Sequence, residues 1–298
     1  MAPAPEVHPT GEEINRFFGE IRPKLHRYCA RMTGSSVDGE DVVQEALMKA
    51  MAALPATDAI LRLESWVFRI AHNTALDFLR RRARRDALHA DEDPDMIADP
   101  ANDTDRDLVA AASLHTFMRL PVAQRSSVIL KDVLGYSLGE IANFLEISVP
   151  TVKAALHRGR ERLRTLADEP DDTPPPALAD GERALLAAYV ERFNAGDFDG
   201  VRAMLADEVR LDLVNRRRLA RRPEVEKYFT NYAHVADWRL VPGLVDGRPA
   251  ALVYDRDEPD GAPIYVILLA WTDGKVALIR DFRYARYILD GATLQPLA

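Results

Sequence analysis

The residues whose types and spacing most clearly suggest a chemical role lie between 148 and 164. There, cationic and short polar side chains share one face of a predicted helix. These are Thr151, Lys153, His157, Arg158, Arg160, Arg162 and Arg164. The opposite face carries Val149, Val152, Leu156 and Leu163 at helical spacing. Cations neutralise phosphates, while arginine forks and short hydroxyls reach base edges. The pattern predicts a helix that lies in the major groove of DNA.

A helix that precedes this one in the chain, at about 138–145, must hold it in position. Ser137 and Glu140 form an S-x-x-E capping box that starts it, and Ile141, Phe144 and Leu145 supply its inward side. The chain turns at 146–147, and Ser148 is a good N-cap for the next helix. We interpret 120–166 as a helix-turn-helix, although a helical hairpin with a merely solvated basic face would show the same pattern.

A longer helix is predicted from Ser65 to Arg85, with one continuous polar stripe that begins at an aromatic ring. The stripe consists of Trp66, Arg69, Asn73, Asp77, Arg80 and Arg84. Aromatic rings stack on unpaired bases, Asn reads base edges and Arg neutralises phosphate, so the stripe suits melting or single-stranded DNA. A solvated helix face with a core Trp is the alternative.

Acidic residues open another helix, which we expect Asp38 to cap. Asp41, Gln44, Glu45 and Met48 share an exposed face by their spacing, opposite a buried stripe that includes Val43 and Leu47. Acids in a first turn also simply favour the helix dipole. Because the polar face continues through Gln44 and Glu45, we favour a protein-binding surface.

Taken together, these motifs resemble an extracytoplasmic-function (group 4) RNA polymerase sigma factor over residues 12 to 168. The motifs, in order, are D-x-E-D-x-x-Q-E, then S-W-V-x-R-I-A-x-N-x-A-L-D-x-L-R-R, then L-P-x-x-Q-R, and finally E-I-A followed by S-x-x-T-V-K-x-x-L-x-R-x-R. Two glycines depart from the usual pattern: Gly39 replaces a common Ala, and Gly159 interrupts the recognition helix.

The resemblance implies three functional surfaces. Docking on the clamp helices of the largest polymerase subunit would involve Asp38, Glu40, Asp41, Gln44 and Glu45. Opening and reading of the minus-ten promoter element would involve Trp66, Asn73, Asp77 and Arg80, and we add Arg69 and Arg84 from the same stripe. Recognition of the minus-thirty-five element would involve Thr151, Lys153, His157 and Arg158, and we add Arg162 from the same face.

Composition is compatible with this interpretation despite a net charge of -8. Five of the six residues from 80 to 85 are Arg, whereas nine acids and one Arg lie between 86 and 107. Such segregated charge indicates separate surfaces with separate partners. The single cysteine, Cys29, and the lack of any apolar run of membrane-spanning length lead us to expect a soluble cytoplasmic protein.

The expected domain organisation has three folded parts and two linkers. Residues 12–86 form a helical domain that binds core polymerase and the minus-ten element, and residues 107–168 form the helix-turn-helix domain. An acidic linker, 87–106, separates them and should behave as an extended tether. A proline-rich linker, 169–180, leads to a domain of residues 181–298.

The sequence of the last domain predicts helices followed by a curved antiparallel sheet. This arrangement is an α+β cone. Asp246-Gly247, Asp260-Gly261 and Asp273-Gly274 supply the hairpin turns. The run Y-V-E-R-F-N-A-G-D-F-D-G-V-R-A-M-L-A-D-E-V looks like a SnoaL-like domain of the NTF2-like superfamily. The fold class is therefore multidomain, with two all-α modules before an α+β cone.

Some relatives of this cone are enzymes, so its polar residues are also candidates for catalysis. Asp212, Tyr254, Asp281 and His234 are the residues we can name, with ordinary strand-face polar residues as the simpler interpretation. The basic run 215–222, N-R-R-R-L-A-R-R, binds DNA or the acidic tether, or is a solvated loop. No metal-ligand cluster or cofactor motif is visible.

The sequence predicts a sigma factor that performs no covalent chemistry and binds core RNA polymerase and promoter DNA. The last domain would regulate in cis, either by holding the sigma modules closed or by sensing a small ligand in its pocket. Two alternatives stay open: a DNA-binding protein fused to a SnoaL-like hydrolase or cyclase, and a helix-turn-helix repressor that needs no polymerase.

Overall fold

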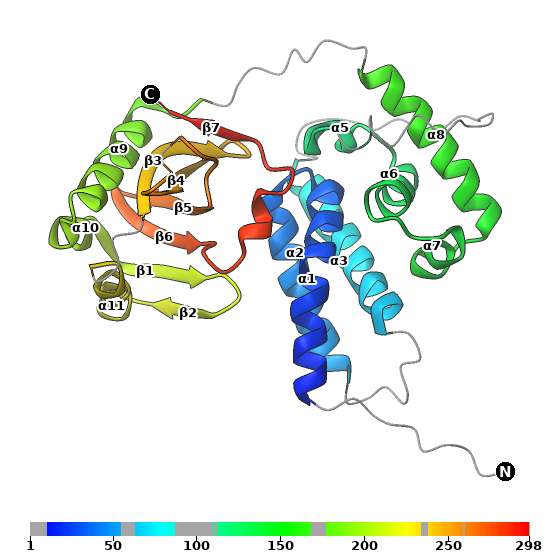
Figure 1. Cartoon of the computed structure of the whole chain (residues 1–298), viewed down its shortest axis with the longest axis horizontal. Helices are drawn as coiled ribbons and strands as arrows, with labels where there is room; N and C mark the ends of the chain where they lie inside the picture. The colour runs from blue at the N-terminus through cyan, green and yellow to red at the C-terminus, as the bar shows by residue number, and fades with distance from the viewer. Residues whose placement is uncertain are drawn as a thin grey trace. The chain divides into compact units, whose positions relative to one another are not determined.

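The computed structural model describes residues 11–54, 63–86, 109, 112–167, 177–233, 238–258 and 260–297. The chain divides into two compact units, residues 1–171 and 172–298, and each is described by itself (Figure 1). The expectations for the acidic linker, for most of the proline-rich linker and for His234 concern residues outside the described ranges.

Three long helices open the first unit. They are α1 (Gly11–Thr33), α2 (Ser36–Ala53) and α3 (Leu63–Asp86). Gly34 ends α1 at φ 76°, a left-handed conformation that glycine adopts without strain. The Ser35 side chain then accepts from the Asp38 amide at 3.3 Å. The expectation that Asp38 caps α2 is therefore wrong, because Ser35 already fills that position.

Two glycines allow helices of this unit to cross closely. A Cβ on Gly39 would lie 2.5 Å from the backbone nitrogen of Ala30, so α1 and α2 meet there backbone to backbone. A Cβ on Gly159 would lie 2.7 Å from Cγ2 of Val128. Both departures from the common pattern thus have a packing reason, which outweighs the cost of glycine inside a helix.

Shorter helices follow among the described residues of the first unit. They are α5 (Leu114–Met118), α6 (Val122–Val128), the π-helical turn η2 (Ile129–Val133), α7 (Leu138–Leu145) and α8 (Val149–Ala167). The Ser137–Glu140 capping box of α7 is confirmed, and Glu146 ends the helix in the left-handed region at φ 56°. The prediction that Val149 faces inward is wrong: it is 36% exposed in the first turn of α8.

One continuous hydrophobic core joins the two groups of helices. Buried side chains from α1 to α3, such as Leu25 and Phe68, belong to the same cluster as Phe144, Val152 and Leu163 from α7 and α8. A hydrophobic core shared by both groups means that they unfold or separate only by exposing apolar surface to water.

The second unit begins with helices and continues into a sheet. The helices are α9 (Asp180–Asn194), α10 (Phe198–Ala203) and α11 (Arg222–Ala233), with the 3₁₀ turn η3 (Arg286–Leu289) near the end. The strands are β1 (Leu205–Leu213), β2 (Arg217–Ala220), β3 (Trp238–Val245), β4 (Arg248–Asp255), β5 (Tyr265–Thr272), β6 (Lys275–Asp281) and β7 (Leu294–Pro296).

The strands form one sheet in the order β2-β1-β6-β5-β4-β3-β7. The pair β1–β6 is parallel, so the expectation of a purely antiparallel sheet is wrong at this position. Asp246-Gly247 and Asp273-Gly274 both have positive φ, as two-residue hairpin turns require, which confirms them as turns. The expected fold class, two helical modules followed by an α+β domain, is confirmed.

One face of this sheet packs against the helices. Leu211, Val253, Ile267 and Ile279 point to that face, where they share a core with residues of α9 and α11. Among the residues that the structure describes, no helix has both the length and the apolar character needed to cross a membrane.

Candidate nucleic-acid interface

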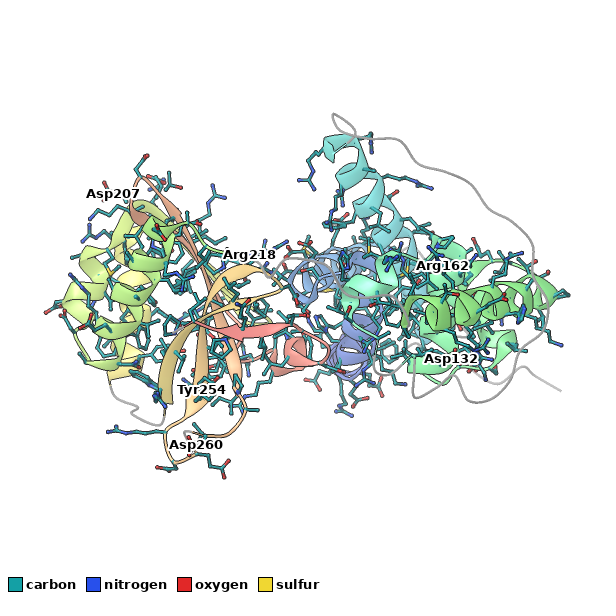
Figure 2. The ribbon with its side chains drawn as sticks, turned by 90° about the horizontal axis from the view of Figure 1, so that it is seen from above. Asp132, Arg162, Asp207, Arg218, Tyr254 and Asp260 are labelled. Atoms are coloured by element: carbon teal, nitrogen blue, oxygen red, sulfur yellow. The ribbon has the colours of Figure 1, made fainter. Side chains whose placement is uncertain are left out.

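The predicted recognition helix α8 presents a basic surface, but not every predicted residue is open to solvent. Thr151, Lys153 and Arg162 are exposed, and Figure 2 shows Arg162 on the outside of the helix. The His157 side chain is only 13% exposed, and Nε of Arg158 is buried without a hydrogen-bond partner. The outer end of the Arg158 guanidinium is therefore the part available to a ligand.

Arg160 has a structural partner. Its Nε and an Nη donate to the carboxylate of Asp132 at 2.9 and 2.6 Å, and the Asp132 side chain is fully buried. This bidentate pair fixes α8 against η2, so that the exposed residues of α8 are held at a defined angle. Arg160 thus positions the helix, and its guanidinium is occupied by Asp132.

The stripe on α3 has two different halves. Asn73, Asp77, Arg80 and Arg84 are exposed, and Arg80 pairs with Asp77 at 3.1 Å along the helix. Trp66 and Arg69, at the start of the stripe, are partly buried. The ring of Trp66 packs against the shared core, so the aromatic side chain expected to meet a base is partly covered.

Aromatic rings cover that half of α3. The rings of Phe68 and Phe144 are stacked with centroids 5.2 Å apart, and Tyr136 meets both edge to face at 5.3 and 4.8 Å. Phe68 belongs to α3, whereas Tyr136 and Phe144 belong to the helix-turn-helix. Offset and edge-to-face pairs of this kind are favourable beyond the area that they bury.

Polar contacts close the same interface. The Tyr136 hydroxyl donates to the Glu64 carboxylate at 2.5 Å, and Lys24 donates to the same carboxylate oxygen at 3.3 Å. Burial and the adjacent carboxylate raise the pKa of Tyr136, so that its hydroxyl stays a donor. Arg69 donates to Glu146, the left-handed residue after α7, at 2.7 Å. Arg69 is therefore occupied by the other module.

A buried guanidinium joins the modules at a second place. Arg125 is 5% exposed and donates to the carbonyl oxygens of Leu120 at 2.9 Å, Met118 at 3.3 Å and Met32 at 2.6 Å. Met32 lies in α1, so this last bond crosses between modules. Desolvation lowers the pKa of Arg125 to about 10, which still leaves it charged at neutral pH.

Only part of the face predicted to dock on polymerase is exposed. Asp41 is exposed and Met48 is 58% exposed, and these residues share one side of α2. Glu45 is partly buried and pairs with Lys49 at 2.8 Å and Arg81 at 2.9 Å, which lowers its pKa. Gln44 and Asp38 are half-buried.

Glu40 differs from its neighbours on α2. Its side chain is 1% exposed and forms an ion pair with Arg22 of α1. A carboxylate that is this strongly buried depends on its cation, because an unpaired charge would be costly there. In this conformation Glu40 holds α1 and α2 together.

Sequence reasoning missed the residues that hold the modules together. Glu64, Tyr136 and Glu146 carry no pattern that distinguishes them from solvated polar residues, and their partners lie far away in the sequence. Arg125 had a signal, since it is the last residue of the L-P-x-x-Q-R motif. An Arg in a run that otherwise reads as a buried helix indicates a specific set of acceptors.

Two candidate catalytic residues of the second unit, Asp212 and Asp281, do not come together. β1 pairs with β6 so that Asp212 is opposite Arg280 and Leu213 is opposite Asp281. Since side chains alternate along strands, Asp212 and Asp281 point to opposite faces of the sheet. Asp212 lies 3.6 Å from both Arg218 and Arg280, so its carboxylate is engaged in a largely buried ion network.

Asp281 is fully buried, with its oxygens already occupied. Its Oδ2 accepts from the hydroxyls of Tyr228 at 2.7 Å and Tyr232 at 2.8 Å, and its Oδ1 accepts from the Arg283 amide at 2.8 Å. Burial raises the pKa of this carboxyl, while the hydrogen bonds oppose the rise. A carboxylate engaged in this way braces β6 against α11 and is poorly placed to remove a proton from a substrate.

The described residues provide no set of metal ligands. Within the described ranges, no group of three or more His, Cys, Asp or Glu side chains could hold a metal ion. The only cysteine, Cys29, is buried.

Comparison with known protein families places the helical modules. Residues 17–85 match the Sigma-70 region 2 family, and residues 114–163 match the Sigma-70, region 4 family. The chain is 28% identical to the ECF RNA polymerase sigma factor SigG of Mycobacterium tuberculosis, over 92% of this chain and 83% of that protein. It is 32% identical to the ECF RNA polymerase sigma factor SigW of Bacillus subtilis, over 48% of this chain and 82% of that protein.

The second unit is similar to a different kind of protein. A solved structure of a ketosteroid isomerase homologue from Kribbella flavida, described as putative, is 24% identical over 34% of this chain and 76% of that chain, with a TM-score of 0.28.

The matches to sigma factors decide the family. The SigW match covers most of that sigma factor at more than 30% identity, and both sigma regions are matched in order. The chain therefore belongs to the extracytoplasmic-function family of RNA polymerase sigma factors, which direct transcription initiation.

Proposed function

We propose that this sigma factor reads a two-part promoter with α3 and α8, and that the free chain holds these helices in a closed arrangement. In this proposal residues 12–86 bind core polymerase and the minus-ten element, residues 107–168 bind the minus-thirty-five element, and residues 181–298 regulate both in cis. We place its action in the cytoplasm, beside RNA polymerase.

The observation that carries the closed arrangement is the shared aromatic contact between Phe68 of α3 and Phe144 of α7, with centroids 5.2 Å apart. Minus-ten and minus-thirty-five elements are centred roughly 25 base pairs apart, which is about 85 Å of DNA axis. Modules held in contact through α3 and α7 cannot reach both elements at once. Promoter binding therefore requires the two modules to separate, and core polymerase would supply the energy by binding the open form better.

The same geometry explains why the free chain should bind promoters weakly. Trp66 and Arg69, which would meet the minus-ten element first, are partly covered, and Arg69 is paired with Glu146. The α8 surface at Lys153 and Arg162 is exposed. The free chain should thus make salt-sensitive phosphate contacts through α8 but lack sequence-specific contacts from α3.

Promoter binding by the full chain, with and without core polymerase, tests this proposal. Core polymerase should strengthen specific binding strongly, and run-off transcription should start at a defined position. Replacing Arg158 by Ala should weaken minus-thirty-five binding by about 1–3 kcal/mol and relax sequence preference, if its guanidinium reaches a base edge. Arg183→Ala, at an exposed position of α9, is the matched control. Tight specific binding without polymerase would favour a repressor instead.

The polymerase-docking face has its own test. Changing Asp41 and Gln44 together to Ala should reduce the affinity for core polymerase, because both lie on the solvent side of α2 near Met48. Glu20→Ala, at an exposed position of α1, removes a carboxylate elsewhere on the same module and serves as the control. Equal affinities for both variants would remove this face from the docking surface.

Regulation in cis by the second unit is supported by the extent of the SigG match, which covers 92% of this chain and so includes the extra domain. A domain retained alongside the sigma modules is expected to act on them. Run-off transcription with residues 1–298 and 1–171 measures the direction: higher activity of the shorter chain means restraint, and lower activity means that the domain is needed. Identical activity would contradict a regulatory role.

A non-enzymatic role for this domain is supported by the state of Asp281, whose two oxygens together accept three hydrogen bonds. We therefore propose that the domain performs no covalent chemistry.

A further inference from the structure

The hairpin of β1 and β2 carries an unusual concentration of arginine in an acidic protein. Six Arg and one Asp lie between positions 210 and 222, whereas the whole chain has a net charge of -8. Arg218 and Arg222 have carboxylate partners in Asp212, Asp207 and Glu226. In the part of the chain that the structure describes, the four others are exposed and form no ion pair: Arg210, Arg216, Arg217 and Arg221.

These arginines are held by an ordered framework. Nδ2 of Asn215, in the turn, donates to the Tyr284 carbonyl at 3.3 Å and to the Tyr287 hydroxyl at 3.0 Å, which ties the turn to the segment after β6. The Arg216 guanidinium lies 4.6 Å from the centre of the Tyr284 ring, and that ring is 49% exposed. The hairpin therefore presents a cationic surface with a stacked aromatic side chain, and little ordering is left for a ligand to impose.

Arg221 occupies a backbone position that does not favour arginine. Its φ is 68°, and its amide donates to the Val209 carbonyl at 2.9 Å where β2 ends. Glycine or asparagine adopts this left-handed conformation with less strain. A non-glycine residue in this conformation is a reason to look for a role of its side chain.

Protection of the sheet edge does not explain the cluster. Charged residues on an edge strand prevent pairing with other chains, and β2 is an edge strand of this sheet. Arg210, however, lies on β1, which is hydrogen-bonded on both sides, and Arg216 lies in the turn. Figure 2 shows Arg218 and Asp207 at separate places on the hairpin, because they belong to different ion pairs, Arg218–Asp212 and Arg222–Asp207.

We propose that the β1–β2 hairpin binds the phosphate backbone of double-stranded DNA and thereby makes the second unit a third DNA contact of this sigma factor. Guanidinium groups match phosphate oxygens well, and the four unpaired groups are of this one type. The exposed set lacks the Asn and Gln forks typical of base reading, so the contact is independent of sequence. The inference rests on the proposed function in one respect: promoter DNA is the duplex that the complex brings near the hairpin.

The test measures how promoter affinity depends on salt. Full-length protein with core polymerase is titrated with promoter duplex between 50 and 200 mM salt, for the wild type and for the triple variant Arg216→Gln, Arg217→Gln, Arg221→Gln. If each side chain contacts one phosphate, the slope of log K against log salt should become shallower by about 2.7. Over this salt range the wild type should then lose about 40-fold more affinity than the variant.

Two further variants keep the result interpretable. The triple Lys variant retains the charges, so its slope should stay near that of the wild type. The control variant Arg183→Gln, Lys227→Gln, Arg239→Gln removes three exposed cations elsewhere in the same unit and should also leave the slope unchanged. A triple Gln variant with the slope of the control would overturn the proposal. So would higher initiation with an unchanged slope, which would make the hairpin a restraint on the protein.

A second measurement separates this inference from the proposed function. The same variants are titrated, without polymerase, with a duplex of mixed sequence, because a backbone contact needs neither a promoter nor polymerase. A shallower slope for the triple Gln variant supports the hairpin contact even if the holoenzyme initiates nowhere. Equal slopes here and with polymerase would refute the contact while leaving the sigma function intact.

Discussion

Removing one hydroxyl should shift the balance between the closed and open arrangements of the sigma modules. In the variant Tyr136→Phe the aromatic ring keeps its contacts with Phe68 and Phe144, while the 2.5 Å hydrogen bond to Glu64 is lost. The perturbation therefore acts on one polar contact between modules and leaves the packing in place.

The magnitude follows from the exposure of the acceptor. A hydrogen bond to a charged group contributes about 1.5–3 kcal/mol when both partners lose water. The Glu64 side chain is 40% exposed and also has Lys24 as a partner, so the loss should be smaller. We expect about 1 kcal/mol, which is roughly a fivefold increase in the open-to-closed ratio. Where the open form is rare, the apparent affinity for core polymerase should rise by about the same factor.

Single-molecule energy transfer between dyes on Arg16→Cys and Thr165→Cys measures this ratio directly. Both positions are exposed, on α1 and α8, and the native Cys29 is fully buried with a raised pKa, so it should not react with the dyes. Core-polymerase affinity is measured in parallel.

A matched control removes another tyrosine hydroxyl from the same unit. Tyr28 lies 2.7 Å from Nδ1 of His72, but both residues belong to the first module. Tyr28→Phe should lower stability without changing the open-to-closed ratio. If Tyr136→Phe left both the ratio and the polymerase affinity at wild-type values, or if Tyr28→Phe shifted the ratio equally, the closed contact would not govern binding.

Two further predictions concern stability. Gly159→Ala places a Cβ 2.7 Å from Val128 and should destabilise the first unit by about 1–2 kcal/mol. Gly139→Ala, whose added Cβ has nothing within 4 Å, should stabilise it by up to about 1 kcal/mol. Urea denaturation of both variants measures the difference, and equal effects would contradict the close helix crossing at Gly159. Desolvation lowers the pKa of His72 to about 4, below the unfolded value near 6.5, so the unfolded state binds more protons between these pH values and stability falls as pH drops through them. His72→Gln should remove this component of the pH dependence, and an unchanged pH profile would argue against a buried neutral His72.

Local patterns predicted what local forces determine. The capping box at Ser137 and Glu140 was visible because both partners lie within one helical turn. The turns at Asp246 and Asp273 were visible because few residues other than glycine, asparagine and aspartate tolerate positive φ. The sigma modules were recognisable because four short motifs occur in order, each confined to a short stretch of the chain.

Contacts between distant segments were beyond such patterns. The parallel pairing of β1 with β6 depends on how the chain crosses the sheet, and no alternation within either strand encodes it. The pairs Tyr136–Glu64 and Arg69–Glu146 join residues 72 and 77 positions apart. For the same reason the sequence assigned Glu40 and Arg69 to open surfaces, where the structure gives each a charged partner.

The aromatic contact between Phe68, Tyr136 and Phe144 also bears on what happens to idle copies of this protein. Each ring of this size hides roughly 150–250 Å² when fully packed, so separation of the modules creates a sizeable apolar patch. Copies that open without polymerase would present that patch to one another and to proteases. In the proposed mechanism, the closed packing would therefore limit self-association as well as promoter binding, because it keeps these rings out of water.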